Sequence, residues 1–319
     1  MPPCSIVRPG YEVVMEKHYR DYADFLGEHF DGKMQKLSVN TGNSCPNRDG
    51  TIGHGGCSYC NNMAFTPAYC LATDSIAVQL DKGRRFFSRK YNDMRYLAYF
   101  QSYTSTHGSL GRFKEACEEA LAVDDIDGIV VGTRPDCFDR PTARFLGGLL
   151  REGRFVMMEF GAESAHDMTL RRVNRCHRWA DTVFAVNMAR KEGLFTGVHL
   201  IMGLPGESRT MMLQTVAALN LLCPDTVKFH QLQVVGGTRL ADDVAEGKES
   251  VQSLSVDGYL DLCCDLVARL NPAIAIERFT SQSPGDMLIS PRWGLKNHEF
   301  VHKLERLLNA RGIIQGCLS

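Results

Sequence analysis

Long apolar runs are missing from this sequence, as are an excess of charge and any low-complexity tract. No stretch of about 18 or more consecutive apolar residues occurs, so we expect no membrane-spanning helix. The first residues lack a basic segment followed by an apolar one, so we expect no secretory signal and a cytoplasmic location. The 36 basic and 37 acidic side chains leave a formal net charge of -1. This balance argues against broad attraction to nucleic acid but does not exclude a local basic patch.

Cysteine, in contrast, is enriched, with 12 in 319 residues, although not to the density of a disulfide scaffold. In a reducing cytosol, clustered thiols usually indicate metal or redox chemistry. Most cysteines outside one loop, such as Cys117, Cys223, Cys263 and Cys264, lie in helix-like apolar patterns. We interpret these as small buried hydrophobic residues, and Cys137 as a buried thiol rather than a reactive one.

Short apolar strands, each followed by a helical pattern, recur at intervals of about 30 residues, which is the length of a βα unit. This alternation predicts an α/β fold with a parallel sheet covered by helices. Six such units can form a partial TIM-like barrel. The predicted strands lie at 35–40, 95–101, 127–133, 154–161, 197–203 and 226–235, and the helices near 74–91, 111–123, 140–151, 179–192 and 208–222.

Two further segments flank the predicted barrel. Residues 14–30 place Tyr19, Tyr22, Leu26 and Phe30 on one helical stripe, which we expect to pack on the barrel rim. The chain after about residue 240 has the pattern of a helix, a strand and a second helix, at 256–270, 273–280 and 297–310. We therefore predict an N-terminal extension, a barrel and a C-terminal α/β extension packed on it, with bounds 1–34, 35–238 and 239–319.

Three cysteines lie in the loop after the first predicted strand, within "SCPNRDGTIGHGGCSYCNN". Cys45, Cys57 and Cys60 give the spacing C-x11-C-x2-C. In parallel barrels the loops after the strands build the active site, so this position favours function. The glycines of the loop let its backbone wrap closely around a bulky cofactor.

The number of cysteines separates two kinds of metal site. A structural zinc site is closed by four protein ligands, and Cys70 or His54 is a candidate for the fourth. Three cysteines suit instead an iron–sulfur cluster with one iron left open for a substrate. The loop by itself favours the open cluster, and the zinc site remains the alternative.

The cysteine loop, with Tyr59 before its last cysteine, resembles the cluster loop of the radical S-adenosylmethionine (radical SAM) superfamily. Its long spacing is similar to that of the radical SAM half of the elongator catalytic subunit. The string "CPNRDGTIGHGGCSYCNN", with "GTRPDC", "NRCH", "GLPGE" and "QG" further on, resembles a bacterial family of radical SAM proteins of about this length. The resemblance implies a partial barrel of the radical SAM type.

The same resemblance implies the chemistry. Cys45, Cys57 and Cys60 would hold a [4Fe–4S] cluster, and SAM would bind its open iron. An electron donor such as flavodoxin or ferredoxin would reduce the cluster, which would cleave SAM to methionine and a 5′-deoxyadenosyl radical. The protein would supply orientation and exclusion of water.

Positions that match the family also suggest SAM contacts. Glu163 would reach the ribose hydroxyls and Arg175 the carboxylate of SAM, in agreement with the pairing of guanidinium and carboxylate groups. The alternative is a surface glutamate beside a solvated arginine cluster. Thr133 and Arg134 would border the cofactor or substrate.

Three further candidates for cofactor binding match by position alone. Gln101 and Ser102 lie where relatives carry a Gly-Gly-Glu-like segment that receives the methionine amino group, although this chain lacks the glycines. A polar strand end is an equally good interpretation. His199 stands where some relatives place a cofactor-binding aspartate, but a single histidine on a strand is more often structural.

The elongator resemblance suggests as substrate the wobble uridine of tRNA, modified at its C5 side chain. The segments 83–95 and 170–178, rich in arginine, suit a phosphate track, although such runs are more often solvated helix faces. No acetyltransferase domain is found, so we do not expect acetylation. The alternatives are a radical SAM enzyme that acts on a small metabolite or tetrapyrrole, and a zinc-bound structural or adaptor protein.

Several polar residues near the end of the predicted barrel have no fixed role. Lys228, His230, Gln231 and Gln233 crowd the last barrel strand, where polar side chains are costly unless they are paired or line a cavity. We expect them to contact substrate. Arg278 and Trp293 are shared with the resembling family, and rim packing is as good an interpretation as function.

Overall fold

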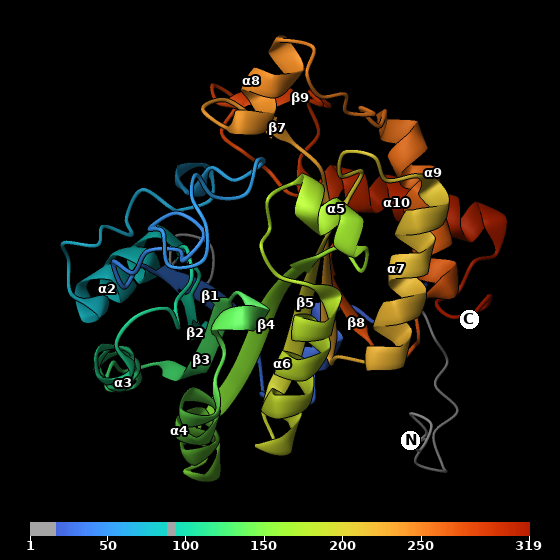
Figure 1. Ribbon diagram of the computed structural model, residues 1–319. Helices are drawn as coiled ribbons and strands as arrows, with labels where there is room; N and C mark the ends of the chain where they lie inside the picture. Colours follow the sequence, from blue (N-terminus) through green and yellow to red (C-terminus); the bar gives the residue numbers. More distant parts are fainter. Residues whose placement is uncertain (1–16, 88–93) are drawn as a thin grey trace.

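Seven parallel strands form a curled sheet in the computed structural model, which describes residues 17–87 and 94–319 (Figure 1). Each strand of this sheet pairs with the next strand that belongs to it, as a series of βα units requires, and only the step from β6 to β8 omits a strand. The predicted partial TIM-like barrel is confirmed. The strands are β1 (Met34–Val39), β2 (Arg95–Phe100), β3 (Ile126–Thr133), β4 (Phe155–Glu163), β5 (Phe195–Met202), β6 (Thr226–Gln231) and β8 (Ala275–Arg278).

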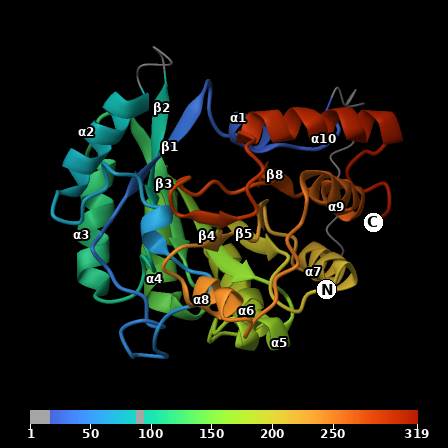
Figure 2. The same ribbon diagram turned by 90° about the horizontal axis from the view of Figure 1, so that it is seen from above.

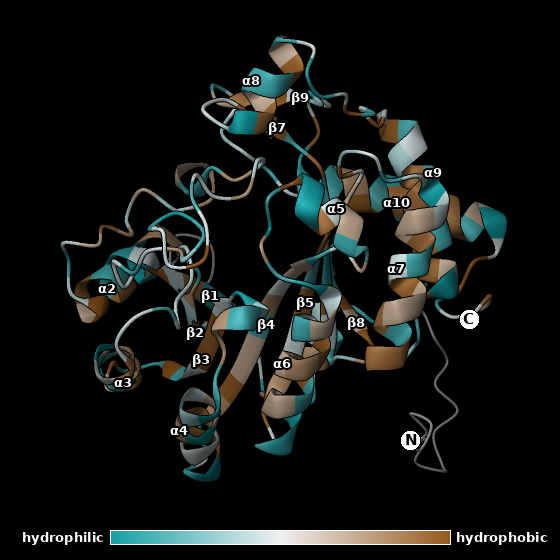
Figure 3. Ribbon diagram, in the orientation of Figure 1, coloured by the Kyte–Doolittle hydropathy of each residue, from teal (hydrophilic) through white to brown (hydrophobic). Residues whose placement is uncertain are grey.

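Five helices alternate with the strands and cover the outer face of the sheet (Figure 1). Ser109, Asp139 and Ser208 precede three of them and accept a hydrogen bond from a backbone N–H of the first turn, which fixes where each helix begins. Figure 3 shows that the helices carry both hydrophobic and hydrophilic residues. These helices are α2 (Ile76–Phe87), α3 (Leu110–Leu121), α4 (Arg140–Arg151), α6 (Trp179–Lys191) and α7 (Arg209–Leu222).

A short helix, α1 (Tyr22–Gly27), closes the end of the barrel at which the strands begin. The Phe25 ring lies 6.4 Å from that of Phe155 and 5.7 Å from that of Phe195, which begin β4 and β5. Aromatic packing of this kind excludes water from that end. The segment predicted as a helical stripe over 14–30 is therefore helical only over 22–27, and residues 14–16 lie outside the described part.

The C-terminal part both extends the sheet and covers it (Figure 2). β8 pairs with β6 as the seventh strand, while α9 (Val256–Arg269) and α10 (Asn297–Arg311) pack on each other beside α7. The predicted single strand 226–235 is wrong, because the chain leaves the sheet after β6. It then forms a separate antiparallel pair from β7 (Val234–Val235) and β9 (Leu288–Ser290).

The remaining elements are short. They are α5 (Asp167–Arg172), α8 (Arg239–Ala245) and two 3-10 turns, Asn62–Ala64 and Pro135–Cys137. Within the described residues no helix is long and apolar enough to cross a bilayer. The division into three parts at residues 34 and 238 stays a prediction.

Candidate functional site

A cavity of about 230 Å³ lies among the carboxyl ends of the strands and the loops that follow them. It brings together residues from Cys45 to Ser281, which are 236 positions apart along the chain. Most predicted site residues line this cavity together: Cys45, Cys57, Tyr59, Cys60, Gln101, Thr133, Glu163, Arg175 and His199. Ser102 is buried but is not among the lining residues.

The cysteine loop is held over the cavity by the segment that follows β4. Asn47, which is fully buried, donates from Nδ2 to the Asn174 carbonyl oxygen at 2.5 Å, and the Ser58 N–H donates to the Val173 oxygen at 2.9 Å. Gly56 has a φ of +76°, where a Cβ atom would lie 2.9 Å from the Arg48 side chain. Only glycine adopts this tight turn without strain.

The donor set around the cysteines does not match a closed zinc site. In residues 17–87 and 94–319, no three histidine, cysteine, aspartate or glutamate side chains are placed to hold a single metal ion. Cys70 donates to the Ser38 carbonyl oxygen at 2.9 Å, and neither Cys70 nor His54 lines the cavity. Three cysteines around one cavity fit a larger group than a single ion, as an iron–sulfur cluster is.

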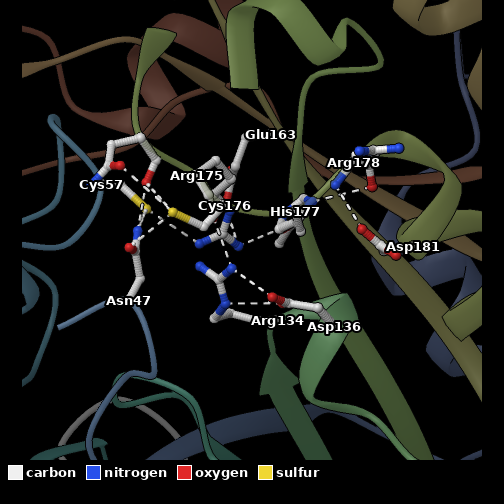
Figure 4. Close-up of polar contacts among 12 residues, drawn as sticks. Asn47, Cys57, Arg134, Asp136, Glu163, Arg175, Cys176, His177, Arg178 and Asp181 are labelled. Atoms are coloured by element: carbon white, nitrogen blue, oxygen red, sulfur yellow. Dashed lines mark hydrogen bonds and ion pairs between the residues drawn. The ribbon is translucent and has the colours of Figure 1, made fainter. Parts of the chain in front are cut away.

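Arg175 joins the cysteines to the end of β4 (Figure 4). Its Nη1 atom lies 3.5 Å from Cys57 Sγ, and its Nη2 atom donates to the Gly161 oxygen at 2.5 Å and pairs with Glu163 Oε1 at 3.3 Å. Burial, and next the neighbouring Cys57, raise the pKa of Cys60 to about 11.

An irregularity in β4 turns Glu163 toward the cavity. The register with β5 shifts between Gly161 and Glu163, and Glu163 has a φ of +69°. Such bulges re-aim side chains and are common next to active sites. Burial raises the pKa of the Glu163 carboxyl, while Arg175 and Arg134 oppose that rise.

Several buried polar atoms in the cavity wall have no hydrogen-bond partner among the residues that the structure describes. They are Arg175 Nε, Arg134 Nη1, Tyr59 OH and Thr104 Oγ1. A buried donor left without an acceptor costs about 1–3 kcal/mol, so native proteins rarely keep one without a reason. Guanidinium donors aimed at one space fit a ligand that carries a carboxylate, as SAM does, and the residues present therefore fit the cofactor that the resemblance implies.

A charge network lies at the inner end of the cavity. Glu159, which has no exposed side-chain surface, lies 2.6 Å from both Lys36 Nζ and Lys228 Nζ, and each lysine also pairs with Glu277. Burial alone would raise the pKa of Glu159, but Lys228 and Lys36 hold it well below its usual value. His199 Nε2 lies 3.0 Å from Glu159, and burial, then Lys228, lower the pKa of His199 to about 4.

Sequence reasoning identified Lys228 but missed Glu159 and Lys36. Glu159 left a signal, because it is the one charged residue in the middle of the apolar strand "FVMMEFG". A charge at such a position requires partners from other strands. His230, Gln231 and Gln233 line the cavity, and their contact with substrate stays a prediction. Lys228 does not line the cavity and belongs to the charge network through Glu159.

The two basic segments differ in their relation to the cavity. Arg84 and Arg95 pair with Asp81 and Asp127, and Arg95 begins β2 at the sheet edge opposite to the cavity. The described part of the segment 83–95 therefore does not fit a phosphate track at the site. Its residues Arg89 and Lys90 lie outside the described part. The segment 170–178 follows β4, and its Arg171 and Arg178 are exposed.

Comparison with family models gives two matches. The model of the radical SAM superfamily matches residues 39–219, and the model of the radical SAM C-terminal domain matches residues 224–310. Together the two matches cover the barrel strands β2 to β6 and the C-terminal part through most of α10.

Relatives of similar length include the Bacillus subtilis protein YtqA and the Escherichia coli protein YhcC. YtqA is 34% identical over 301 residues, which are 94% of this chain and 92% of YtqA. YhcC is 33% identical over 299 residues, which are 94% of this chain and 95% of YhcC. A tRNA uridine(34) acetyltransferase of Methanocaldococcus infernus is 28% identical over 138 residues, 40% of this chain and 25% of that protein.

Among solved structures, the chain is similar to Elp3 of the archaeon Methanocaldococcus infernus. The TM-score is 0.65 with 14% sequence identity, and the match covers 90% of this chain and 65% of the Elp3 chain. At this identity the likeness establishes the fold alone.

Proposed function

This chain belongs to the radical SAM superfamily, and from that premise we propose that it is a cytoplasmic enzyme that modifies the C5 side chain of the wobble uridine in tRNA. The cofactors of the superfamily are a [4Fe–4S] cluster and SAM, and its enzymes need a reductant, for which we propose flavodoxin or ferredoxin. When bound, the cluster and SAM supply a 5′-deoxyadenosyl radical, which can take a hydrogen atom from an unactivated carbon.

We infer that the cysteine loop holds the cluster and that the end of β4 holds SAM. Cys45, Cys57 and Cys60 surround the same cavity as the unpartnered donors of Arg175 and Arg134. The guanidinium group of Arg175 would bind the SAM carboxylate, and the buried Glu163 carboxylate would accept from the ribose hydroxyls. Tyr59, Gln101, Thr133 and His199 would complete the cofactor pocket.

The chain's own residues then orient the substrate and exclude water. The apolar packing under α1 closes one end of the barrel, while the cysteine loop covers the other. A reactive radical is protected from solvent in such a space. The polar residues at its inner end, Tyr99, Glu159 and His230, can fix the polar groups of a substrate through hydrogen bonds.

Two observations support tRNA as the substrate. The first is the partial sequence likeness to tRNA uridine(34) acetyltransferases. The second is a pair of aromatic residues that line the cavity yet remain open to solvent, because Phe65 is 38% and Tyr103 40% exposed. Exposed aromatic rings beside a deep pocket suit stacking of an unpaired base and its neighbours. The exposed Arg171 and Arg178 can contact phosphates.

The test is mass spectrometry of nucleosides from the tRNA of cells with and without the gene, with Cys57→Ala as the complementing control. We expect one modified wobble uridine to be replaced by its precursor in both the deletion and the Cys57→Ala strain. Purified protein should then convert tRNA from the deletion strain in a reaction that needs SAM and a reductant.

The alternatives give different results. Unchanged tRNA nucleosides, with intact SAM cleavage and no binding of tRNA, would overturn the tRNA substrate in favour of a small metabolite or tetrapyrrole. Zinc without iron or sulfide, after anaerobic purification and reconstitution, would overturn the radical SAM chemistry in favour of a structural or adaptor protein.

A further inference from the structure

Arg278, the last residue of β8, lines the cavity and has no carboxylate partner in residues 17–87 and 94–319. Its Nη2 atom contacts His230 Nε2 at 3.3 Å, and its Nε atom is buried and has no hydrogen-bond partner. We propose that Arg278 and His230 form a subsite that binds a singly charged oxyanion of the substrate, either a carboxylate or a phosphodiester. The assignment of this oxyanion to an RNA substrate rests on the proposed function.

The backbone of β8 is built so that Arg278 faces the cavity. In a regular strand neighbouring side chains point to opposite faces, so Glu277 and Arg278 would be separated. Here the register with β6 shifts: Val227 pairs with Ile276, and Lys228 pairs with Arg278. The extra residue is Glu277, which reaches Lys36 and Lys228 inside the barrel, and Arg278 reaches His230 on the same side.

The other buried cations of the barrel are neutralised by acidic side chains. Lys36 and Lys228 share Glu159 and Glu277, which makes two positive charges against two negative ones. Of the other arginines that line the cavity, Arg134 pairs with Asp136 and Arg175 with Glu163. Arg48 is exposed to solvent and donates to the Cys60 carbonyl oxygen. For Arg278, in contrast, the described residues provide no ion pair.

The titratable groups around Arg278 and His230 do not supply a negative charge that would neutralise Arg278. Burial, and next Arg278 and His199, lower the pKa of His230 well below its usual value, so this ring is neutral. His199 is also neutral near pH 7, because its pKa lies at about 4, and its ring lies 5.8 Å from that of His230. Glu159 and Glu277 face this region from β4 and β8 but are bound to the two lysines.

The unbalanced positive charge of Arg278 indicates which class of ligand the subsite would bind. A partly buried guanidinium with an open Nε position presents a planar pair of donors, which matches the two oxygens of a carboxylate or of a phosphodiester. Each of these groups carries one negative charge and would balance the subsite. The carboxylate of SAM would bind elsewhere, at Arg175, whose Nη1 atom lies 3.5 Å from the proposed cluster ligand Cys57.

The first test measures the subsite with small anions on the reconstituted protein. Thermal unfolding is followed in sodium acetate, in sodium dimethyl phosphate and in sodium chloride of equal ionic strength, for wild type, Arg278→Gln, Arg278→Lys and Arg306→Gln. Arg306 is exposed on α10, so Arg306→Gln makes the same charge change away from the cavity. We expect one anion to stabilise the wild type and the control, and Arg278→Gln to lose that response.

The anion that stabilises the wild-type protein identifies the charged group of the substrate that the subsite binds. A response to acetate indicates a carboxylate on the substrate, and a response to dimethyl phosphate indicates the RNA backbone. Equal responses of wild type and Arg278→Gln to both anions would overturn the subsite. If Arg278→Gln does not fold, Arg278→Lys decides: it keeps the charge but loses the planar donor pair, and a response as large as that of the wild type would overturn the proposal.

The second test uses tRNA from the deletion strain. Loss of a charge-assisted hydrogen bond should lower kcat/KM for nucleoside conversion by Arg278→Gln about 10- to 100-fold. Affinity for SAM should stay within about twofold of the wild type; a loss as large as that in kcat/KM would assign Arg278 to the cofactor instead. If the wild type leaves this tRNA unchanged, the proposed function fails, while the anion measurement still decides on Arg278.

Discussion

Glu159 on β4 and Lys228 on β6 form an ion pair of 2.6 Å across the inside of the barrel, although β5 lies between their strands in the sheet. Neither side chain is exposed to solvent by more than 3%. The curl of the sheet makes this contact, since side chains of alternate strands meet at the barrel centre. The ion pair therefore depends on the closure of the fold and not on neighbouring residues.

Replacement of Glu159 by glutamine should destabilise the protein by about 3–5 kcal/mol, because it leaves two buried ammonium groups to share Glu277 alone. Urea unfolding under anaerobic conditions measures this change in the free energy of unfolding. The control is Glu246→Gln, which removes one partner of the exposed Glu246–Lys248 pair and should change stability by less than about 0.5 kcal/mol. A loss below about 1 kcal/mol for Glu159→Gln would contradict the role of this network.

The double variant Glu159→Gln/Lys228→Met separates two causes. If an unpaired buried charge is the main cost, removal of the Lys228 ammonium group should restore part of the lost stability. A double variant as unstable as the sum of the two single variants would instead indicate independent packing losses.

The strands and the cysteine loop were predictable, because both leave local patterns. Apolar runs at the spacing of βα units placed β1 to β5 to within about two residues at each end. The position of Cys45, Cys57 and Cys60 after the first strand predicted that they lie at the carboxyl ends of the strands, and all three line the cavity there. Local sequence is enough for such features because neighbouring residues determine them.

The inward turn of Arg278 was not predictable from the sequence. An alternating pattern assigns each residue of a strand to one face, and a bulge breaks that alternation without a characteristic residue. In β8 the bulge sets Glu277 and Arg278 on the same side. The prediction of one strand over 226–235 was wrong for a related reason. Its apolar residues belong to two strands, β6 and β7, which lie in different sheets.

Replacement of Cys57 by alanine should remove the cluster, whereas Cys70→Ala should keep it. Cys57 lines the cavity beside Arg175, while Cys70 is occupied by a hydrogen bond to the Ser38 oxygen outside the cavity. Iron and sulfide content after reconstitution measures the difference, with near-complete loss expected for Cys57→Ala and a wild-type content for Cys70→Ala. Loss of metal from Cys70→Ala would indicate a closed four-cysteine site.

A methyl group at Gly161 should weaken SAM binding about tenfold while the cluster stays intact. A Cβ atom there would lie 2.7 Å from both Arg175 Nη2 and Glu163 Oε1, so both side chains have to move. A tenfold weaker affinity corresponds to a loss of about 1.4 kcal/mol of binding free energy. The measurement is the dissociation constant of SAM under anaerobic conditions. Gly148→Ala is the matched control, because a Cβ atom at this position in α4 meets nothing within 4 Å.

Gly148→Ala should leave SAM affinity unchanged and raise stability by about 0.5–1 kcal/mol, as alanine does in a helix interior. Unchanged SAM affinity in Gly161→Ala would argue against a SAM site at Arg175 and Glu163.

The pH dependence of stability should carry the signature of His199. Burial lowers the pKa of this ring from 6.5 to about 4 in the folded protein, so below pH 6.5 the unfolded chain takes up a proton that the folded chain does not. Stability is therefore lost as the pH falls from about 6.5 to 4. Between pH 7 and pH 5 this single group should cost about 2 kcal/mol. Urea unfolding at the two pH values, for wild type and His199→Gln, should show a difference of that size; parallel losses in both proteins would mean that His199 is protonated as readily in the folded barrel as in water.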